Sequence, residues 1–225
     1  MNNLIRSELL KQRTVRLPLI AMAAAAITGA LTAIAIITTS DHAGNPPLDR
    51  HSLTQLVNSP FAVVAGAALL LGIFGTAGEF RHQTITSTLL VAPRRGQLLT
   101  AKVLVHAGLG AVLAVVACAV SLAVSIPWLT AHHVPLAGPA DVARVVAGIV
   151  VAAALFGAAG AGFGALVANQ TAAVTVSLVW LLAVEGLVVS ITSTPTLHEW
   201  LPGGAIGAKR QRPDVLGGRG IAIDI

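Results

Sequence analysis

Long intervals without Lys, Arg, Asp or Glu constrain the fold of this sequence more than any other feature. They cover residues 17–40, 52–78, 103–140 and 145–184. A helix that crosses the roughly 30 Å hydrocarbon core of a bilayer needs about 20 apolar residues. Each interval is long enough for one crossing, and the fourth, with 40 residues, is long enough for two. The intervals therefore predict an all-α fold, a polytopic membrane helical bundle.

The composition of the chain excludes several other classes of protein. Charged residues make up 10% of the sequence, where soluble domains carry about 25%. The single cysteine, Cys118, can form neither an intramolecular disulfide nor a cysteine-based zinc site. Tyrosine is absent and aromatics are 4%, which leaves little material for stacking on bases. We expect a lipid bilayer as a partner and no nucleic acid.

Proline and polar residues divide the longer intervals. The stretch from Pro127 to Pro139 interrupts the third interval, and Asn169-Gln170-Thr171 gives the fourth a tight polar turn. The sequence therefore predicts five transmembrane helices. Their expected bounds are about 17–38, 61–78, 103–126, 142–167 and 172–191.

Basic residues predict the orientation of the chain, because cytoplasmic segments carry an excess of Lys and Arg. Arg50 and Arg144 are the only Lys or Arg residues in the two outer loops, whereas the N-terminal segment and residues 79–102 are basic. We expect a cytoplasmic N-terminus and a cytoplasmic loop at 79–102. The basic residues on this side are Arg6, Lys11, Arg13, Arg16, Arg81, Arg94, Arg95 and Lys102.

The C-terminal segment departs from this pattern. Five crossings place the C-terminus outside, yet residues 205–225 form a polar tail rich in Gly and Arg. The tail has no apolar run long enough for a sixth crossing. We expect either a disordered outer segment or a six-span protein that was truncated or frame-shifted.

Catalytic signatures are missing from the sequence. It contains no Gly-x-Ser-x-Gly elbow, no His-Glu-x-x-His and no Walker lysine. The adjacent His132 and His133 make a poor metal site, so we expect neither a metal nor enzymatic activity. Gly157, Gly160 and Gly164 lie inside an apolar helix, where small residues let two helix backbones approach. We interpret these glycines as a packing face and not as a phosphate-binding loop.

The cytoplasmic loop contains a short helical pattern. Ile85 and Leu89 are four residues apart and form one apolar face, and Pro93 ends the segment. A short Thr-rich helix is marginally stable alone. It would gain stability by docking on another protein.

This loop resembles that of permease subunits of type-2 ABC transporters, the bacterial drug and antibiotic exporter class. The common pattern is Gly-Glu, an aromatic and an Arg, then Thr-Ile, paired apolar residues, Pro-Arg and a Lys that opens the third span. The resemblance covers residues 1–204, and this part would be the permease transmembrane domain. The matching loop residues are Glu79, Phe80, Arg81, Thr84, Ile85, Leu89, Leu90, Pro93, Arg94 and Lys102.

The resemblance implies a transport subunit of the bacterial plasma membrane. Its partners would be a second permease copy, identical or different, and separate ATPase subunits that bind ATP and Mg. The matching loop residues and Arg95 would couple the permease to the ATPase, and Glu79 and Arg81 would form a polar clasp. The basic N-terminal segment would lie along the inner leaflet. Family members usually have six spans, and this sequence lacks the last.

Glu185 is the one carboxylate well inside a predicted span. A charge at the bilayer centre costs about 2.5 to 3.5 kcal/mol, so Glu185 either faces a transport pathway or an interface or lies near the outer end of its helix. Two alternatives to a permease stay open. One is a non-transporting interaction, immunity or sensor protein derived from a truncated permease. The other, an ion-coupled carrier, is disfavoured because only Glu185 could relay protons within the spans.

Overall fold

Helices are the only regular elements in the part of the chain that the computed structural model describes, which is residues 2–40, 48–81 and 95–181. The all-α prediction is confirmed for these residues. Residues 1–175 form one unit, and a second unit begins at residue 176. In chain order the helices are α1 (Asn2–Thr14), α2 (Leu17–Thr39), α3 (Ser52–Asn58), α4 (Phe61–Arg81), α6 (Arg95–Ala131), α7 (Pro139–Val167) and α8 (Gln170–Val179).

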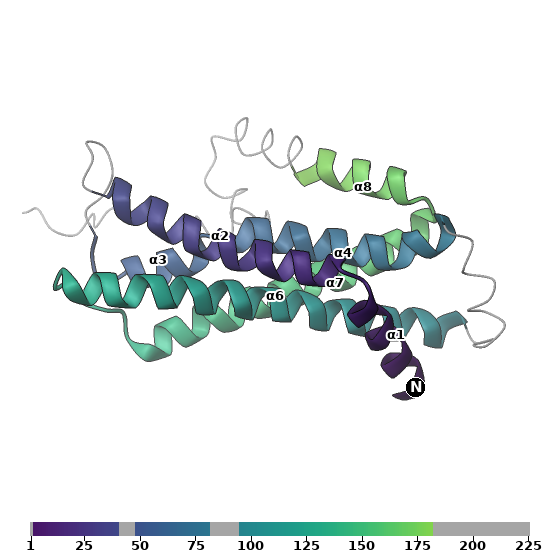
Figure 1. The fold of residues 1–225 in the computed structure, drawn as a ribbon, viewed down its shortest axis with the longest axis horizontal. Helices are drawn as coiled ribbons and strands as arrows, with labels where there is room; N and C mark the ends of the chain where they lie inside the picture. Colours follow the sequence, from purple (N-terminus) through teal and green to yellow (C-terminus); the bar gives the residue numbers. More distant parts are fainter. Residues whose placement is uncertain (1, 41–47, 82–94, 182–225) are drawn as a thin grey trace, which may run out of the picture. The chain divides into compact units, whose positions relative to one another are not determined.

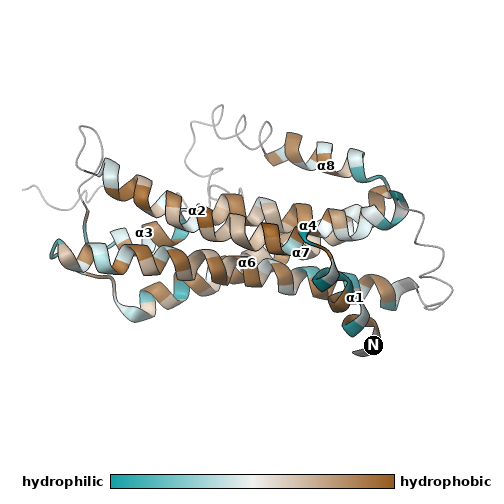
Figure 2. Ribbon diagram, viewed as in Figure 1, coloured by the Kyte–Doolittle hydropathy of each residue, from teal (hydrophilic) through white to brown (hydrophobic). Residues whose placement is uncertain are grey.

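Four helical segments within the described residues are long and apolar enough to cross a membrane. Hydrophobic residues dominate these segments, while hydrophilic residues gather on α1 and at the helix ends (Figure 2). Helices α2, α4, α6 and α7 run side by side, and α1 meets α2 at an angle (Figure 1). The four segments are Leu17–Thr39, Ser52–Glu79, Gly96–Ala131 and Pro139–Val167.

The third predicted crossing, 103–126, is too short. Helix α6 has 37 residues and continues through Pro127 to Ala131. A proline removes one backbone donor, but the turn beyond it is held by other contacts. Leu129 is fully buried, and the Thr130 hydroxyl donates to the carbonyl of Ile126. Burial of Leu129 therefore outweighs the break expected at Pro127.

The two ends of the segment predicted to be cytoplasmic, 79–102, are helical. Residues Glu79 to Arg81 belong to α4, and residues Arg95 to Lys102 belong to α6. At about 1.5 Å per residue, α6 is about 55 Å long, which exceeds the hydrocarbon thickness of about 30 Å. Helix α6 is therefore longer than one crossing needs, and the prediction of a cytoplasmic segment at 79–102 stays a prediction.

The predicted polar turn lies where α7 meets α8. Ala168 ends α7 in the left-handed conformation, with φ of 51°, and the Asn169 side chain accepts a hydrogen bond from the Ala172 N–H. Helix α8 then begins at Gln170, two residues before the expected start of the fifth crossing. Residues 182–191 of that crossing lie outside the described residues.

Glycines bring the helix backbones close together along α7. A methyl group at Gly157 would overlap the carbonyl of His106 on α6, and one at Gly160 would overlap the carbonyl of Leu69 on α4. At Gly164 the neighbour is Thr76 of α4. These three glycines therefore lie at helix crossings, where α7 packs on α4 and α6.

Replacing Gly160 by alanine should destabilise the bundle by about 1 to 3 kcal/mol, because the added methyl group pushes α7 away from α4. The measurement is the thermal denaturation midpoint of the detergent-purified protein. Size-exclusion chromatography monitors the loss of folded protein as the temperature rises. Gly162→Ala is the matched control, since its methyl group meets no atom within 4 Å. Equal midpoints for the two variants would contradict this packing.

Candidate functional site

Helix α1 lies against the end of the bundle where α4 ends and α6 begins (Figure 1). It buries a carboxylate and exposes leucines. The Glu8 side chain is only 3% exposed, whereas Leu9 and Leu10 are 46% and 54% exposed. A soluble amphipathic helix buries its apolar face instead, so α1 is docked through its polar face.

Two glutamates and two lysines meet at this contact. Lys102 Nζ donates to Glu8 Oε2 at 3.1 Å, to Glu79 Oε1 at 2.6 Å and to the Gly75 carbonyl at 3.5 Å. Lys11 Nζ donates to Glu8 Oε1 at 2.9 Å and to Glu79 Oε1 at 3.1 Å. We call Glu8, Lys11, Glu79 and Lys102 the ion cluster. Its formal charges cancel, and it joins α1, α4 and α6.

The ion cluster keeps its two α1 residues, Glu8 and Lys11, charged. Burial alone would raise the pKa of Glu8, but the ammonium groups of Lys102 and Lys11 hold that pKa below its ordinary value. Burial alone would lower the pKa of Lys11, but the carboxylates of Glu8 and Glu79 raise it. Both α1 residues are therefore ionised near neutral pH, as a buried ion pair requires.

His106 lies one turn beyond Lys102 on α6 and is only 1% exposed. Its Nδ1 is 2.8 Å from the Lys102 carbonyl oxygen, and its Nε2 is 3.3 Å from the amide nitrogen of Gln12 on α1. The ring lies against Gly75 of α4, where a methyl group would overlap the imidazole. His106 therefore adds a second polar contact between α1 and the bundle.

The sequence reasoning missed Glu8, Lys11, Gln12 and His106. A signal for three of them exists in the spacing of polar residues along two helices. The pairs at positions 8 and 12 and at positions 102 and 106 are each four residues apart, which places both members on one helix face. Polar residues repeated at this interval are consistent with a polar contact between helices.

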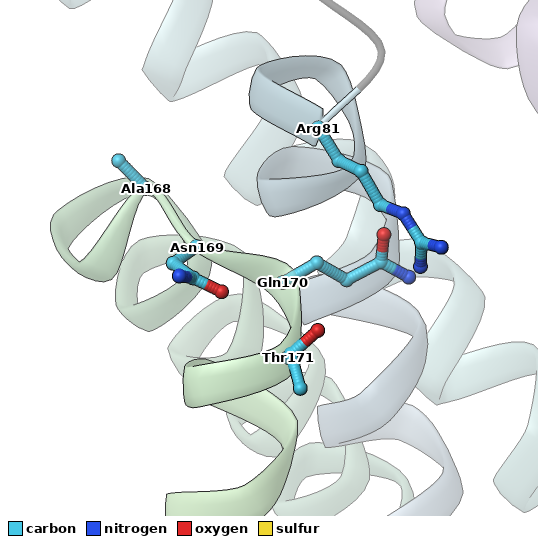
Figure 3. A pocket seen from close by; sticks show the side chains of 5 residues that line it. All are labelled: Arg81, Ala168, Asn169, Gln170 and Thr171. Carbon is cyan, nitrogen blue, oxygen red and sulfur yellow. The ribbon is translucent and has the colours of Figure 1, made fainter.

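Arg81 does not belong to the ion cluster that contains Glu79. It is the last residue of α4 and is exposed. With residues 168–171 at the turn between α7 and α8, it lines a pocket of about 330 Å³. Figure 3 shows the Gln170 side chain reaching toward Arg81. Among the described residues that line the pocket, Arg81 is the one charged side chain.

The other predicted site residues of the loop lie outside the described residues or have side chains outside them. Phe80 and Arg95 belong to α4 and α6, but their side chains are not among those described. Glu185 also lies outside the described residues. The predicted loop residues that also lie outside the described residues are Thr84, Ile85, Leu89, Leu90, Pro93 and Arg94.

The side chains of the site form ion pairs and hydrogen bonds that join helices α1, α4 and α6. Each carboxylate oxygen of Glu8 accepts a hydrogen bond from a lysine, and all partners come from different turns or helices. Among the described residues, no group of three His, Cys, Asp or Glu side chains could hold a metal ion. The arrangement can hold helices together.

Comparisons of the chain with protein-family models, with curated proteins and with solved structures found no match.

Replacing Lys102 by methionine should destabilise the protein by about 3 to 5 kcal/mol, because the buried Glu8 carboxylate and the partly buried Glu79 carboxylate would lose the cation between them. The free energy of unfolding in mixed micelles measures this loss. Arg144→Met is the matched control, since it breaks the exposed Asp141–Arg144 pair, and we expect no measurable change there. A Lys102→Met variant as stable as the control would refute the role of the ion cluster.

Proposed function

We propose that this chain is the transmembrane permease subunit of a bacterial type-2 ABC transporter. It would form the substrate pathway for ATP-driven export, with ATP and Mg bound by a separate ATPase subunit. The resemblance of residues 79–102 to the coupling loop of such permeases supports this proposal. So do the four helices long and apolar enough to cross a membrane.

One observation carries the proposal beyond the resemblance. The ion cluster contains a residue from each side of the proposed ATPase-binding loop, residues 82–94. Glu79 lies in the last turn of α4 before the loop, and Lys102 lies in the second turn of α6 after it. Their 2.6 Å contact closes the base of the loop, and Glu8 and Lys11 attach α1 to the same point.

Burial makes this attachment stiff. Removing one partner from a buried ion pair typically costs about 3 to 5 kcal/mol, and the Lys102 side chain is only 5% exposed. A force on the loop would therefore move the end of α4, the start of α6 and α1 together. The glycine crossings of α7 with α4 and α6 would carry the same movement into the bundle. In this way ATPase closure would reach the substrate pathway.

The proposed orientation places the ion cluster on the cytoplasmic side of the plasma membrane. Lys11, Lys102 and Arg81 lie at one end of the bundle, because α1, the end of α4 and the start of α6 meet there. The opposite end carries Arg50 and Arg144. An excess of basic residues on one side favours the cytoplasm for that side. A second permease copy would complete the pathway.

The proposal is tested by affinity purification of the tagged chain from detergent-solubilised membranes of its native bacterium, with bound proteins identified by mass spectrometry. We expect recovery of a protein with ATPase motifs. Replacing residues 82–94 by a Gly/Ser segment of equal length should abolish recovery. The matched control replaces residues 41–47, which follow α2 in the sequence, and should leave recovery unchanged.

Two results would contradict the proposal. If the unaltered chain recovers no ATPase, the protein is not a permease subunit, and the non-transporting interaction protein becomes the better account. If the ATPase is recovered equally well after replacement of residues 82–94, the loop is not the docking site. Loss with both replacements would point to a general folding defect and would not support docking at the loop.

A further inference from the structure

Helix α3 is separated from α4 by a break in the backbone hydrogen bonds. Ser59 and Pro60 lie between the two helices. Proline has no N–H, so the carbonyl of Leu56, four residues earlier, loses the donor that a continuous helix would give it. Leu56 is fully buried, and a buried carbonyl without a donor is costly. Another group must therefore donate to this carbonyl.

The donor comes from α6. The Ser121 hydroxyl donates to the Leu56 carbonyl at 2.9 Å, and Ser121 is fully buried. The Ser59 hydroxyl lies 2.7 Å from the same carbonyl and 2.9 Å from Thr32 Oγ1 of α2. It has one hydrogen to share between these two acceptors. The break is therefore held by hydroxyl groups of α6 and α2.

Two polar contacts of unequal strength now join the α3–α4 segment to α6. One is the Glu79–Lys102 pair of the ion cluster. The other is the Leu56–Ser121 hydrogen bond, about 28 Å away along α6 at about 1.5 Å per residue. A hydrogen bond between charged groups is about twice as strong as a neutral one. Movement relative to α6 is therefore easier at α3 than at the ion cluster.

Helix α6 offers the Leu56 carbonyl a second donor. Ser125 lies one turn after Ser121 on the same face of α6, and it is also fully buried. Its hydroxyl has no hydrogen-bond partner among the described residues. While Ser121 serves the carbonyl, rotation about χ1 would let Ser125 donate to the backbone of its own helix, so an unused Ser125 costs little. The two serines therefore define two positions for one carbonyl.

The backbone between α3 and α4 is long enough for this movement. Because the α3–α4 segment runs antiparallel to α6, movement from Ser121 to Ser125 carries α3 away from α4 by one turn, about 5.4 Å. Extending residues 58–60 from a rise of about 1.5 Å to about 3.3 Å per residue supplies about 5 Å. The extension breaks the hydrogen bonds that the Ser59 N–H donates to α3. The Ser125 position therefore holds a minority of the molecules.

A shift by one turn also repeats the apolar pattern of α3. Val57 would move to the place that Leu53 occupies now, so an apolar side chain again meets the same surface. Leu53 is 3% exposed, Leu56 and Val57 are fully buried, and all three belong to one apolar core. The shift would therefore free the space that Leu56 and Val57 fill in this core.

We propose that α3 has two positions on α6, one turn apart, in which the Leu56 carbonyl binds the hydroxyl of either Ser121 or Ser125. The Ser121 position closes the core at α3, and the Ser125 position opens it. One-turn movements of one packed element past another are a known form of conformational switch. The two positions are a property of this chain alone. Their use as a gate of the export pathway rests on the proposed function.

Double electron–electron resonance on the purified full chain in lipid nanodiscs measures the position of α3. Spin labels replace Gln55 of α3 and Thr100 of α6, which are both exposed, and Cys118→Ala removes the native thiol. We expect a main distance and a minor one that is longer by about 5 Å. Labels at Val63 of α4, which is exposed, and Thr100 form the reference pair, for which we expect one distance.

Two matched serine variants separate the two positions. Ser121→Ala removes the donor of the main position and should raise the ratio of the longer to the shorter distance at least about fivefold, the effect of one hydrogen bond. Ser125→Ala removes the donor of the minor position and should lower that ratio by a similar factor. Both changes remove one buried hydroxyl from the same face of α6. A general loss of packing would therefore affect both variants alike.

Absence of the longer distance in Ser121→Ala would overturn the proposal, and so would a change in the same direction in both serine variants. If Ser121→Ala does not fold, the chain with both serines decides. One distance there overturns the proposal, as does a longer distance that persists undiminished in Ser125→Ala. The experiment contains no ATPase, so its failure is distinguishable from failure of the permease proposal, which depends on recovery of that partner.

Discussion

A buried charge in an apolar chain must be neutralised by a partner, and this requirement organises the end of the bundle at which α1 docks. Over the whole residue, Glu8 is 2% exposed and Lys102 is 4% exposed, so neither charge is stabilised by bulk water. Each is satisfied by residues from other helices, which fixes α1 against α4 and α6. The polar contact replaces the hydrophobic contact by which a soluble amphipathic helix would dock.

Close helix packing makes this contact possible. Gly75 leaves room for the His106 ring and offers its carbonyl to Lys102. Along α7, Gly157 and Gly160 allow the backbones of α6 and α4 to approach. In an apolar solvent, helix association depends on such packing and on hydrogen bonds between helices, since lipid offers no hydrophobic driving force. Small residues and buried charges therefore act together to set the helix positions.

The sequence predicts the helical class well and the polar contact poorly. A charge-free interval gives the start of α2 at Leu17, and the polar turn at Asn169-Gln170-Thr171 gives the end of α7 at Val167. Helix α6 is underestimated, because burial of Leu129 overrides the local effect of Pro127. Glu8 pairs with Lys102, which is 94 residues away, and Lys11 pairs with Glu79, which is 68 residues away. No local pattern specifies which distant helices meet.

Under the proposed function, the ion cluster would transmit movement of the loop to the helices. The most direct measurement is ATP hydrolysis by the purified complex of this chain and the proposed ATPase, with and without Glu79→Gln, which removes the charge but keeps the shape. The account predicts normal insertion and normal recovery of the ATPase, with loss of permease-stimulated hydrolysis. Asp141→Asn, in the exposed ion pair, should leave hydrolysis unchanged. Full stimulation in the Glu79→Gln complex would contradict the account.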